Sequence, residues 1–501
     1  MKIMEQRPWW MAPAVIAVVV AALLLIVPRA AGVKPVYLAT DVLLYLLVAM
    51  FGFLAAYMRG QPHLLGPWRA VFRRRVAMAA VVVLSAYVIV GLVDSVHFRR
   101  ALPLHAGSTQ VDYSVQVLSL FDVVTEPLWS RSEQTYSAPF ATRLFSKQPE
   151  TMPDGTIQRI YPRLKYGGAG LDNPAKEELP DILQRIGKGA ILGVVTWSVA
   201  VWLILVVAAR RHHTGVRRLA ARLIRGDTVL PWRVALYTAL LLTVLAACCA
   251  MLAVEYHILG TDKVGGDVFY QTLKSIRTGL VIGTLTTLVM LPFAIMLGIA
   301  AGYFRGWVDD LIQYIYTTLN SIPGVLLIAA SILSIQVYIT NHPALVETSA
   351  DRADLRLLAL CVVLGITSWT GLCRLLRGEA LKLREVDYIQ AATAFGVGHM
   401  KILLRHILPN VMHIVLIIVV LDFSGLVLAE AVLSYVGVGV DPTTISWGNM
   451  INSARLEMAR EPMVWWSLAG AFIFMFALVL SANLFADAVR DAFDPHFREN
   501  T

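Results

Sequence analysis

Long apolar runs dominate this sequence and restrict what the chain can fold into. As a helix rising about 1.5 Å per residue, each run is long enough to cross about 30 Å of hydrocarbon. Hydrophobic residues make up 57% of the chain and charged residues only 15%, below the roughly 25% of a soluble domain. The sequence predicts an all-α integral membrane protein with about ten transmembrane helices. The expected spans are 12–28, 36–57, 77–95, 188–208, 233–254, 277–302, 312–338, 356–374, 411–437 and 465–486.

The arginine-rich connections between spans predict the topology. The connection 58–76 carries five arginines and no acid, and the connection 209–233 carries seven arginines and one aspartate. Both are expected in the cytoplasm, because positive residues gather on that side. Two crossings separate them, which places both termini in the cytoplasm and the stretch 96–187 outside. The short connection 303–310 opposes this assignment with two aspartates against one arginine, and the two stronger connections outweigh it.

The first apolar run has two interpretations. A mildly basic start and the small residues Ala30-Ala31-Gly32 fit a cleaved signal peptide. Trp9 and Trp10 fit the membrane interface of a retained helix, which we favour. Cleavage would leave every later orientation unchanged, so the expected topology does not depend on this choice.

Composition shifts divide the chain into four parts. Residues 1–95 form an N-terminal extension with three transmembrane helices, and residues 96–187 form a polar extracytoplasmic insert with turn signals and a strand-like run at 111–117. The insert is either a small domain or an ordered loop. Residues 188–230 hold a fourth extra helix and a basic cytoplasmic linker, and residues 231–501 form the last part.

The cytoplasmic connection 387–410 has the composition of two short helices joined by a tight turn. Ala391 and Ala392 allow close backbone approach, and Gly396 permits a left-handed turn. Leu408-Pro409 then restarts a helix. The segment, DYIQAATAFG at 387–396 and ILPN at 407–410, resembles the coupling loop of ABC permeases: an E/Q-A-A triplet, a glycine four residues later and a leucine-proline pair. Gln390 stands where the family often has glutamate.

Other motifs from about Pro231 to the C-terminus extend the resemblance to the dipeptide/oligopeptide/nickel permease family of binding-protein-dependent ABC importers. Gly260, Thr261, Asp262 and Asp267 belong to a turn similar to the family's G-T-D-x-x-G-R-D, in which Gly266 replaces the usual arginine. Such a turn is expected to cap a helix at the outer surface. The remaining matches are AAGYFRGWVD at 300–309, SIPG at 321–324, LSYVGVGV at 433–440, SWGNM at 446–450 and NLFADAVRDAFDP at 483–495.

This resemblance implies a six-helix type I importer core, preceded here by four extra helices and the insert. It implies a multi-pass permease subunit in a bacterial cytoplasmic (inner) membrane that translocates dipeptides or oligopeptides. The implied partners are two ABC ATPase subunits, a second homologous permease, an extracytoplasmic solute-binding protein and membrane lipid. The implied ATPase-coupling residues are Gln390, Ala391, Ala392, Gly396, Leu408 and Pro409.

Three residues are candidates for the translocation path. Pro323 and Gly324 break an expected span, and such breaks are tolerated where neighbours or water satisfy the backbone. Asp422 is expected near the bilayer centre, where an ionised aspartate costs at least about 2.5–3.5 kcal/mol unless it faces a partner or water. We interpret Asp422 as favouring solutes with a positive amine; a protonated or hydrogen-bonded structural role is the alternative. Glu430 is expected near the outer interface.

The sequence lacks the motifs of several other functions. It has no G-x-x-x-x-G-K-[ST] phosphate loop, no H-E-x-x-H, no G-x-S-x-G and no Cys-His cluster with metal-ligand spacing. We therefore expect no catalytic residue, no metal and no cofactor, with ATP bound by partner chains. The net charge of +9 reflects topology rather than nucleic-acid binding. The same machine carrying nickel or another small solute, and a secondary transporter or membrane scaffold without an ATPase, remain alternatives.

Overall fold

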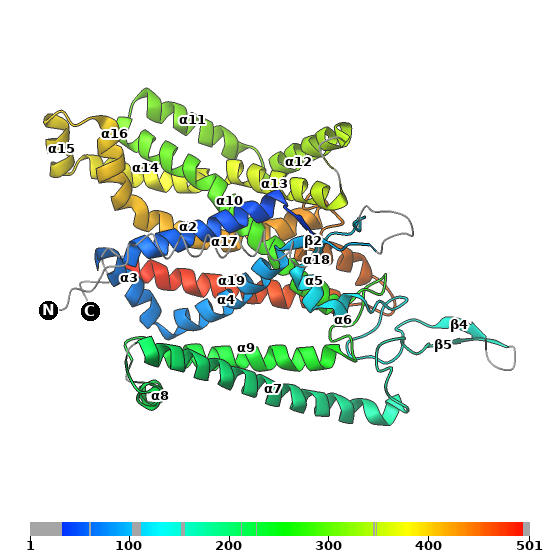
Figure 1. Ribbon diagram of the computed structural model, residues 1–501. Helices are drawn as coiled ribbons and strands as arrows, with labels where there is room; N and C mark the ends of the chain where they lie inside the picture. Colours follow the sequence, from blue (N-terminus) through cyan, green and yellow to red (C-terminus); the bar gives the residue numbers. More distant parts are fainter. Residues whose placement is uncertain are drawn as a thin grey trace.

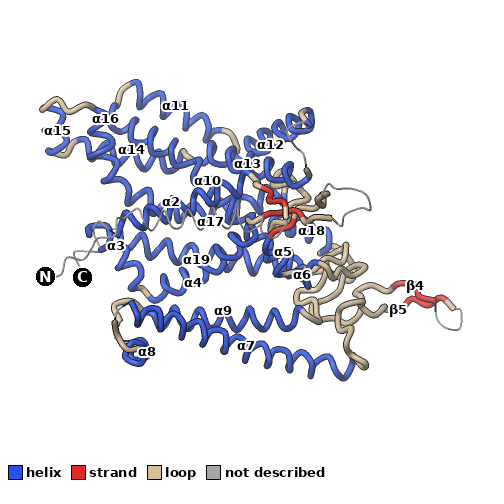
Figure 2. Tube along the Cα trace, in the orientation of Figure 1, coloured by secondary structure: helices blue, strands red, loops and turns tan. Residues whose placement is uncertain are grey.

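The computed structural model is a bundle of long helices with a small β-containing region at one end (Figures 1 and 2). It describes residues 33–59, 62–102, 112–151, 156–211, 213–226, 228–343, 346 and 348–493. Within these ranges, eight helices are long and apolar enough to cross a membrane, and the shorter apolar helix Ala39–Phe53 accompanies them. The expected first span, 12–28, lies outside the described residues.

The extension and insert comprise helices and short strands. They are β1 (Lys34–Val36), α2 (Ala39–Arg59), α3 (Pro62–Arg73), α4 (Arg75–Asp94), β2 (His97–Arg99), β3 (Leu118–Ser119), α5 (Leu120–Val124), α6 (Glu126–Trp129), β4 (Gln148–Thr151), β5 (Ile157–Ile160), α7 (Pro174–Arg211) and α8 (Val216–Arg225).

The rest of the chain is helical. Its elements are α9 (Trp232–Ala253), α10 (Val268–Phe304), α11 (Trp307–Ser321), α12 (Gly324–Asn341), α13 (Ser349–Ser368), α14 (Thr370–Arg384), α15 (Asp387–Ala394), α16 (His399–Ile402), the π-helix η2 (Leu403–Ile407), α17 (Leu408–Tyr435), α18 (Trp447–Glu457) and α19 (Trp466–Phe493).

The nine expected spans that fall on described residues all coincide with helices, with several differences in extent. The expected span 356–374 covers parts of α13 and α14, and α10 begins at Val268, before the expected 277. The expected span 312–338 is split at Ile322 and Pro323 into α11 and α12, because Ile322 takes an extended conformation before the proline. Helix α7 begins at Pro174, inside the stretch expected as the insert, and runs for 38 residues.

Helix α10 is the axis of the bundle. It is 37 residues long, and α2, α4, α11, α13, α14, α17, α18 and α19 all pack on it. Three apolar clusters line its length, one at each end and one against α12 and α13. Close packing is possible because small residues face it: a Cβ on Gly365 of α13 would lie 2.6 Å from Val289.

The extension is built into the bundle rather than attached beside it. Helix α4 lies between α9 on one side and α10 and α19 on the other (Figure 1). Its Gly91 leaves room for Leu280, and Tyr87 donates a hydrogen bond of 2.9 Å to the carbonyl of Phe474. The helix expected to begin the six-helix core, α9, therefore packs on a helix of the extension, and its outer end shares an apolar cluster with α10 and α19.

Helices α7 and α9 form a peripheral hairpin. They pack chiefly on each other, and only 6% of each apolar stretch is buried in the protein. A Cβ on Gly189 or Gly193 of α7 would lie 2.6 Å from the backbone of α9, so glycine sets the close spacing. The apolar residues on the outer face of this hairpin are exposed to lipid.

The described part of the insert lies at the opposite end of the bundle from α3, α8 and α15 (Figures 1 and 2). Strands β1, β2 and β3 form an antiparallel sheet that pairs Val36 with His97 and Phe98 with Leu118. Strands β4 and β5 form a separate hairpin. The described part of the expected strand 111–117 forms only one bridge, between Tyr113 and Ala101, so that expectation is wrong in extent.

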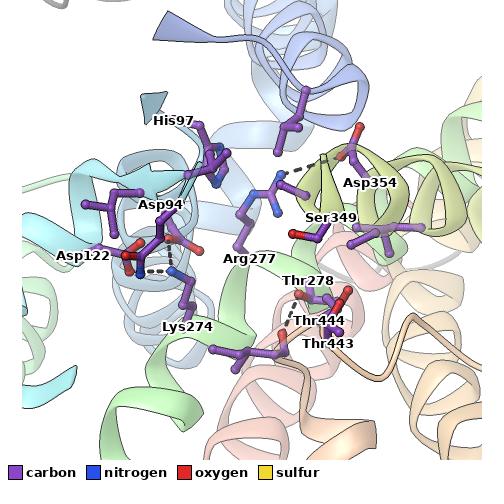
Figure 3. A pocket seen from close by; sticks show the side chains of 18 of the residues that line it. Asp94, His97, Asp122, Lys274, Arg277, Thr278, Ser349, Asp354, Thr443 and Thr444 are labelled. Atoms are coloured by element: carbon purple, nitrogen blue, oxygen red, sulfur yellow. Dashed lines mark hydrogen bonds and ion pairs between the residues drawn. The ribbon is translucent and has the colours of Figure 1, made fainter. Parts of the chain in front are cut away.

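Two cations on α10 receive carboxylates from the extension and the insert. Figure 3 shows Lys274 between Asp94 and Asp122, and Arg277 facing Asp354 of α13 at 4.0 Å. Arg277 donates to Asp41 of α2 at 2.5 Å, and His97 lies 2.7 Å from the other oxygen of Asp41. Lys274 bonds to Asp122 of α5 and lies 3.9 Å from Asp94 of α4. These groups line a cavity of 400 Å³ that also touches α13 and the segment 443–445. The ion pairs fix the extension to the core at this end.

Replacing Arg277 tests whether these ion pairs hold the extension to the core. Arg277→Met removes the permanent cation beside the buried Asp41 and leaves only His97 as its partner. The loss costs up to about 3–5 kcal/mol, so the unfolding temperature should fall by several degrees. The measurement is thermal unfolding of the detergent-purified chain by tryptophan fluorescence. The matched control is Arg74→Met at the exposed Arg74–Asp491 pair, where about 0–1 kcal/mol is expected. Equal shifts in the two variants would contradict a clamp at Arg277.

Candidate functional site

The segment 387–410 forms a compact projection at one end of the bundle (Figure 1). Helix α15 ends at Ala394, Gly396 takes a φ of +73°, and α16 begins at His399. A Cβ on Gly396 would meet no atom within 4 Å, so glycine is required here for its backbone conformation and not for space.

The π-helix η2 precedes Pro409 for a clear reason. A proline in the first turn of α17 has no N–H to donate to the carbonyl of Arg405. A wider turn accommodates the missing bond. The helix runs without a break from His399 to Tyr435, so Leu408-Pro409 marks the base of the projection, and the expected restart of a helix at Pro409 is wrong.

The projection is anchored on one face and open on the other. Ile389, Ile402 and Ile407 are buried in the apolar cluster between α10, α14 and α17. Gln390 and Ala391 are exposed, and the Phe395 side chain is 88% exposed. Apolar residues hold the projection to the bundle, while its outer face presents small and aromatic residues.

Polar contacts fix its orientation. Asn410 donates to the Tyr388 hydroxyl at 2.9 Å, and Tyr303 lies 2.8 Å from Nδ1 of His399. Arg384 donates to the Tyr303 carbonyl at 2.8 Å. An open cleft of 510 Å³ lies beside the projection, between Tyr303, Phe304, Arg384, Glu385, Gln390, Thr393, Ala394 and His399. Movement of α15 is therefore linked directly to α10, α14 and α17.

The candidate path residues do not meet within this subunit. Pro323 and Gly324 are exposed at the junction of α11 and α12, and α12 packs on α13. Asp422 is half-buried on α17, which packs on α10, α14, α18 and α19. Among the described residues Asp422 has no hydrogen-bond or ion-pair partner. The described part of this chain therefore does not supply the hydrogen-bond or ion-pair partner that was expected for Asp422.

Glu430 lies near the end of α17 that is expected at the outer interface, and it faces the protein. Its side chain is buried, and it accepts hydrogen bonds from Ser434 at 2.7 Å and Ser446 at 3.0 Å. A Cβ on Gly448 would lie 2.6 Å from a Glu430 oxygen. Trp447 donates to the Thr272 carbonyl of α10 at 3.0 Å. The LSYVGVGV and SWG motifs thus join α17, α18 and α10 around one buried carboxyl group.

The insert covers Gly260, Thr261 and Gly265 of the outer turn 259–267, while Lys263 and Val264 at its tip stay exposed. Asp267 caps α10 by accepting from the Tyr270 N–H at 2.9 Å, and Asp262 accepts from Gly266 at 2.8 Å. Thr261 is buried and donates to the Thr135 carbonyl at 2.8 Å. A Cβ on Gly260 would lie 2.3 Å from the Ser137 carbonyl. The glycine allows the insert to approach.

A buried charged group lies under this contact. His257 stands 2.7 Å from Asp267 and 3.6 Å from Glu133 of the insert. Glu133 accepts three backbone N–H groups, from Lys165, Tyr166 and Gly167. Burial favours the neutral imidazole, but the two carboxylates outweigh it and raise the pKa of His257 to about 9. Burial is likewise outweighed at Glu133, where His257 and the three backbone N–H groups lower the pKa to about 2.

Comparison with known proteins identifies the family. The model of the family described as "binding-protein-dependent transport system inner membrane component" matches residues 294–499. The glutathione transport system permease protein GsiD of Pectobacterium atrosepticum is 32% identical over 244 residues, 48% of this chain and 73% of that protein. The chain belongs to the permease family of binding-protein-dependent ABC importers. It is a transport component rather than an enzyme, and it is a multi-pass membrane protein.

Further permeases align over a similar share of the chain. The oligopeptide transport system permease protein OppC of Mycobacterium tuberculosis is 31% identical over 242 residues, 48% of this chain and 77% of that protein. A putative peptide permease of Brucella suis is 31% identical over 247 residues, 49% of this chain and 74% of that protein. A chain of the methionine ABC transporter MetNI aligns at 18% identity with a TM-score of 0.32, over 43% of this chain and 93% of that one.

Several residues that shape this ABC permease gave no signal in the sequence reasoning. Lys274, Arg277, Glu133 and His257 were not singled out, because each acts through a partner far away in the chain. Acids at the ends of apolar runs, such as Asp41 and Asp94, were a usable signal, since a charge there needs a partner. No group of described residues has the composition of a metal site.

The charged group under the insert predicts a pH dependence. The pKa of His257 rises from 6.5 in the unfolded chain to about 9 in the folded protein. Its contribution to the free energy of unfolding is therefore complete below pH 6.5 and is lost as the pH rises through 9. The difference corresponds to roughly 3 kcal/mol. Glu133, whose pKa falls from 4.5 to about 2, contributes fully above pH 4.5 and loses this as the pH falls through 2.

The measurement is the unfolding temperature of the purified chain between pH 6 and pH 10. The parent should lose stability between about pH 6.5 and pH 9, and His257→Gln should start lower and change less. His342→Gln, at an exposed histidine on α12, is the matched control and should follow the parent. A His257→Gln curve parallel to that of the parent would show that this histidine is not charged in the folded protein.

Proposed function

We propose that this permease subunit carries small peptides and is driven by two ABC ATPase subunits that dock on α15 and α16. The observation that carries the proposal is the projection 387–410, with an exposed outer face and an inner face anchored by three buried isoleucines. An element that transmits force must be rigid towards the bundle and open towards its partner. Gln390, Ala391, Ala392 and Gly396 lie on or beside that open face.

Phe395 supports the docking proposal. A phenylalanine 88% exposed at the tip of a polar end of the molecule is costly in water and suits a pocket on a partner. The cleft of 510 Å³ beside it offers further surface. Closure of the ATPases would move α15, and the contacts of Tyr303 with His399 and Arg384 would pass this movement to α10 and α14.

The proposed assembly includes a second, similar permease and an extracytoplasmic binding protein. In support, α12 exposes large apolar residues, Leu326, Leu333 and Val337, on the side away from α13. Pro323 and Gly324 lie at the start of that face. The three path candidates would then line one route only when two permeases meet, which fits their separation within one subunit. Both termini would lie in the cytoplasm, on the side of α15.

Two observations support the proposal that the cargo is a peptide: the names of the relatives and the position of Asp422. Relatives named as oligopeptide and peptide permeases align with this chain at 31% identity. Asp422 is half-buried and unpaired among the described residues, so a carboxylate there is available to a positive amine in the route. ATP would be bound by the partner subunits, and this chain would need no cofactor of its own.

The docking prediction uses one exposed residue. Ala391→Arg places a long charged side chain on the open face without disturbing a buried atom, so the ATPase should be lost from the purified complex. The tagged chain is purified in mild detergent, and co-purifying proteins are identified by mass spectrometry. Ala221→Arg, at an exposed alanine of α8, is the matched control and should retain the ATPase. An ATPase that stays with Ala391→Arg would contradict docking on this face.

The route prediction concerns solute charge. Asp422→Asn should reduce uptake of peptides with a free amine about tenfold relative to their N-acetylated forms, the scale of one partly desolvated charge contact. Uptake of both peptides is measured in vesicles that contain the intact transporter. Ser424→Ala, on the same helix, is the control because its hydroxyl bonds to Asn483 and does not carry charge. Equal loss for both peptides would remove the charge-selective role.

A further inference from the structure

The linker helix α8 joins the inner ends of α7 and α9. It begins after the turn 213–215 and ends at Gly226, which takes a φ of +79°. Arg233, in the first turn of α9, donates to the Leu223 carbonyl at 3.1 Å. Figure 1 views α8 nearly down its axis, whereas α7 and α9 run across the picture. The helix is thus held across the end of the hairpin.

The two faces of α8 differ in polarity: one is apolar and the other carries arginines. Val216, Leu219, Ala220 and Leu223 recur at helical spacing and are half-buried towards the ends of α7 and α9. The opposite face carries the exposed arginines Arg217, Arg218, Arg222 and Arg225. Among the described residues these four guanidinium groups have no ion-pair or hydrogen-bond partner. This face therefore presents four cations that are available to an anionic partner from outside the chain.

The neighbouring helices indicate where this face lies. The flanking helices expose apolar side chains along their length, among them Trp202 and Ile204 on α7 and Leu241 and Leu245 on α9. A helix tied across the end of two lipid-exposed spans lies at the boundary between hydrocarbon and water. Ile224, 75% exposed at the border between the two faces of α8, suits the same boundary. Figure 1 places α8 at the end of the bundle that carries α15.

We propose that α8 is a docking surface for anionic phospholipid headgroups of the leaflet on the α15 side. Guanidinium groups bind phosphate through paired N–H donors, and an amphipathic basic helix in the interface plane is attracted to an anionic leaflet. A lipid surface fits better than a protein partner, because the hairpin that holds α8 is surrounded by lipid and contacts little of the bundle. This surface plays no part in the transport cycle proposed above.

The experiment places a fluorescent reporter beside the arginine face. An environment-sensitive NBD dye is attached at Ile224→Cys in a chain whose half-buried cysteines are removed by Cys248→Ala and Cys249→Ala. The full chain is incorporated into nanodiscs of phosphatidylcholine, with or without phosphatidylglycerol. The charge variant combines Arg217→Gln, Arg218→Gln, Arg222→Gln and Arg225→Gln; the matched control replaces the same four residues by lysine.

The expected result is a blue shift of the dye when phosphatidylglycerol is present, lost in the glutamine variant and kept in the lysine control. Native mass spectrometry should show that the glutamine variant retains phosphatidylglycerol about tenfold less well, with phosphatidylcholine unchanged. Identical spectra in the two lipid compositions would overturn the proposal. So would a dye that responds only when an ATPase subunit is added, because the occupant would then be a protein.

Discussion

The ion pairs that α10 makes with the extension join the two parts of this permease into one body. Lys274 and Arg277 take up carboxylates from α2, α4 and α5, and the cavity of 400 Å³ beside them lies where the extension meets α13. Each cation would be too costly to bury alone, and so would each aspartate. Since α4 also packs on α9, α10 and α19, the extension is part of the permease framework.

The same helix links the two ends of the molecule. At the outer end, its cap Asp267 belongs to the charged group with His257 and Glu133 that holds the insert. At the inner end, Tyr303 contacts His399 in the projection 387–410. A helix of 37 residues, packed along its length by other helices, transmits displacement with little loss. The arrangement therefore suits a subunit that must relate events on the two sides of a membrane.

Hydropathy was sufficient to predict the spans, because each must bury about 20 apolar residues in lipid whatever its neighbours are. The turn at Gly396 and the break at Pro323 also followed from the residues themselves. The position of α4 did not, since its contacts join residues more than 100 positions apart and leave no periodic pattern. The contacts of Glu133 did not either, because they join it to a loop at Lys165–Gly167 and to the distant His257. The hydrogen bonds of Glu430 were missed for a related reason: Ser446 lies in a later segment that folds back over it.

The central claim is that ATP hydrolysis on partner chains drives solute inward through this subunit. Its most direct test is uptake of a labelled peptide into vesicles that contain the chain with its co-purified partners, with the binding protein outside. The account predicts accumulation above the external concentration only when ATP is enclosed, with no accumulation from an imposed proton or sodium gradient. Accumulation driven by such a gradient without ATP would contradict the account and identify a secondary transporter.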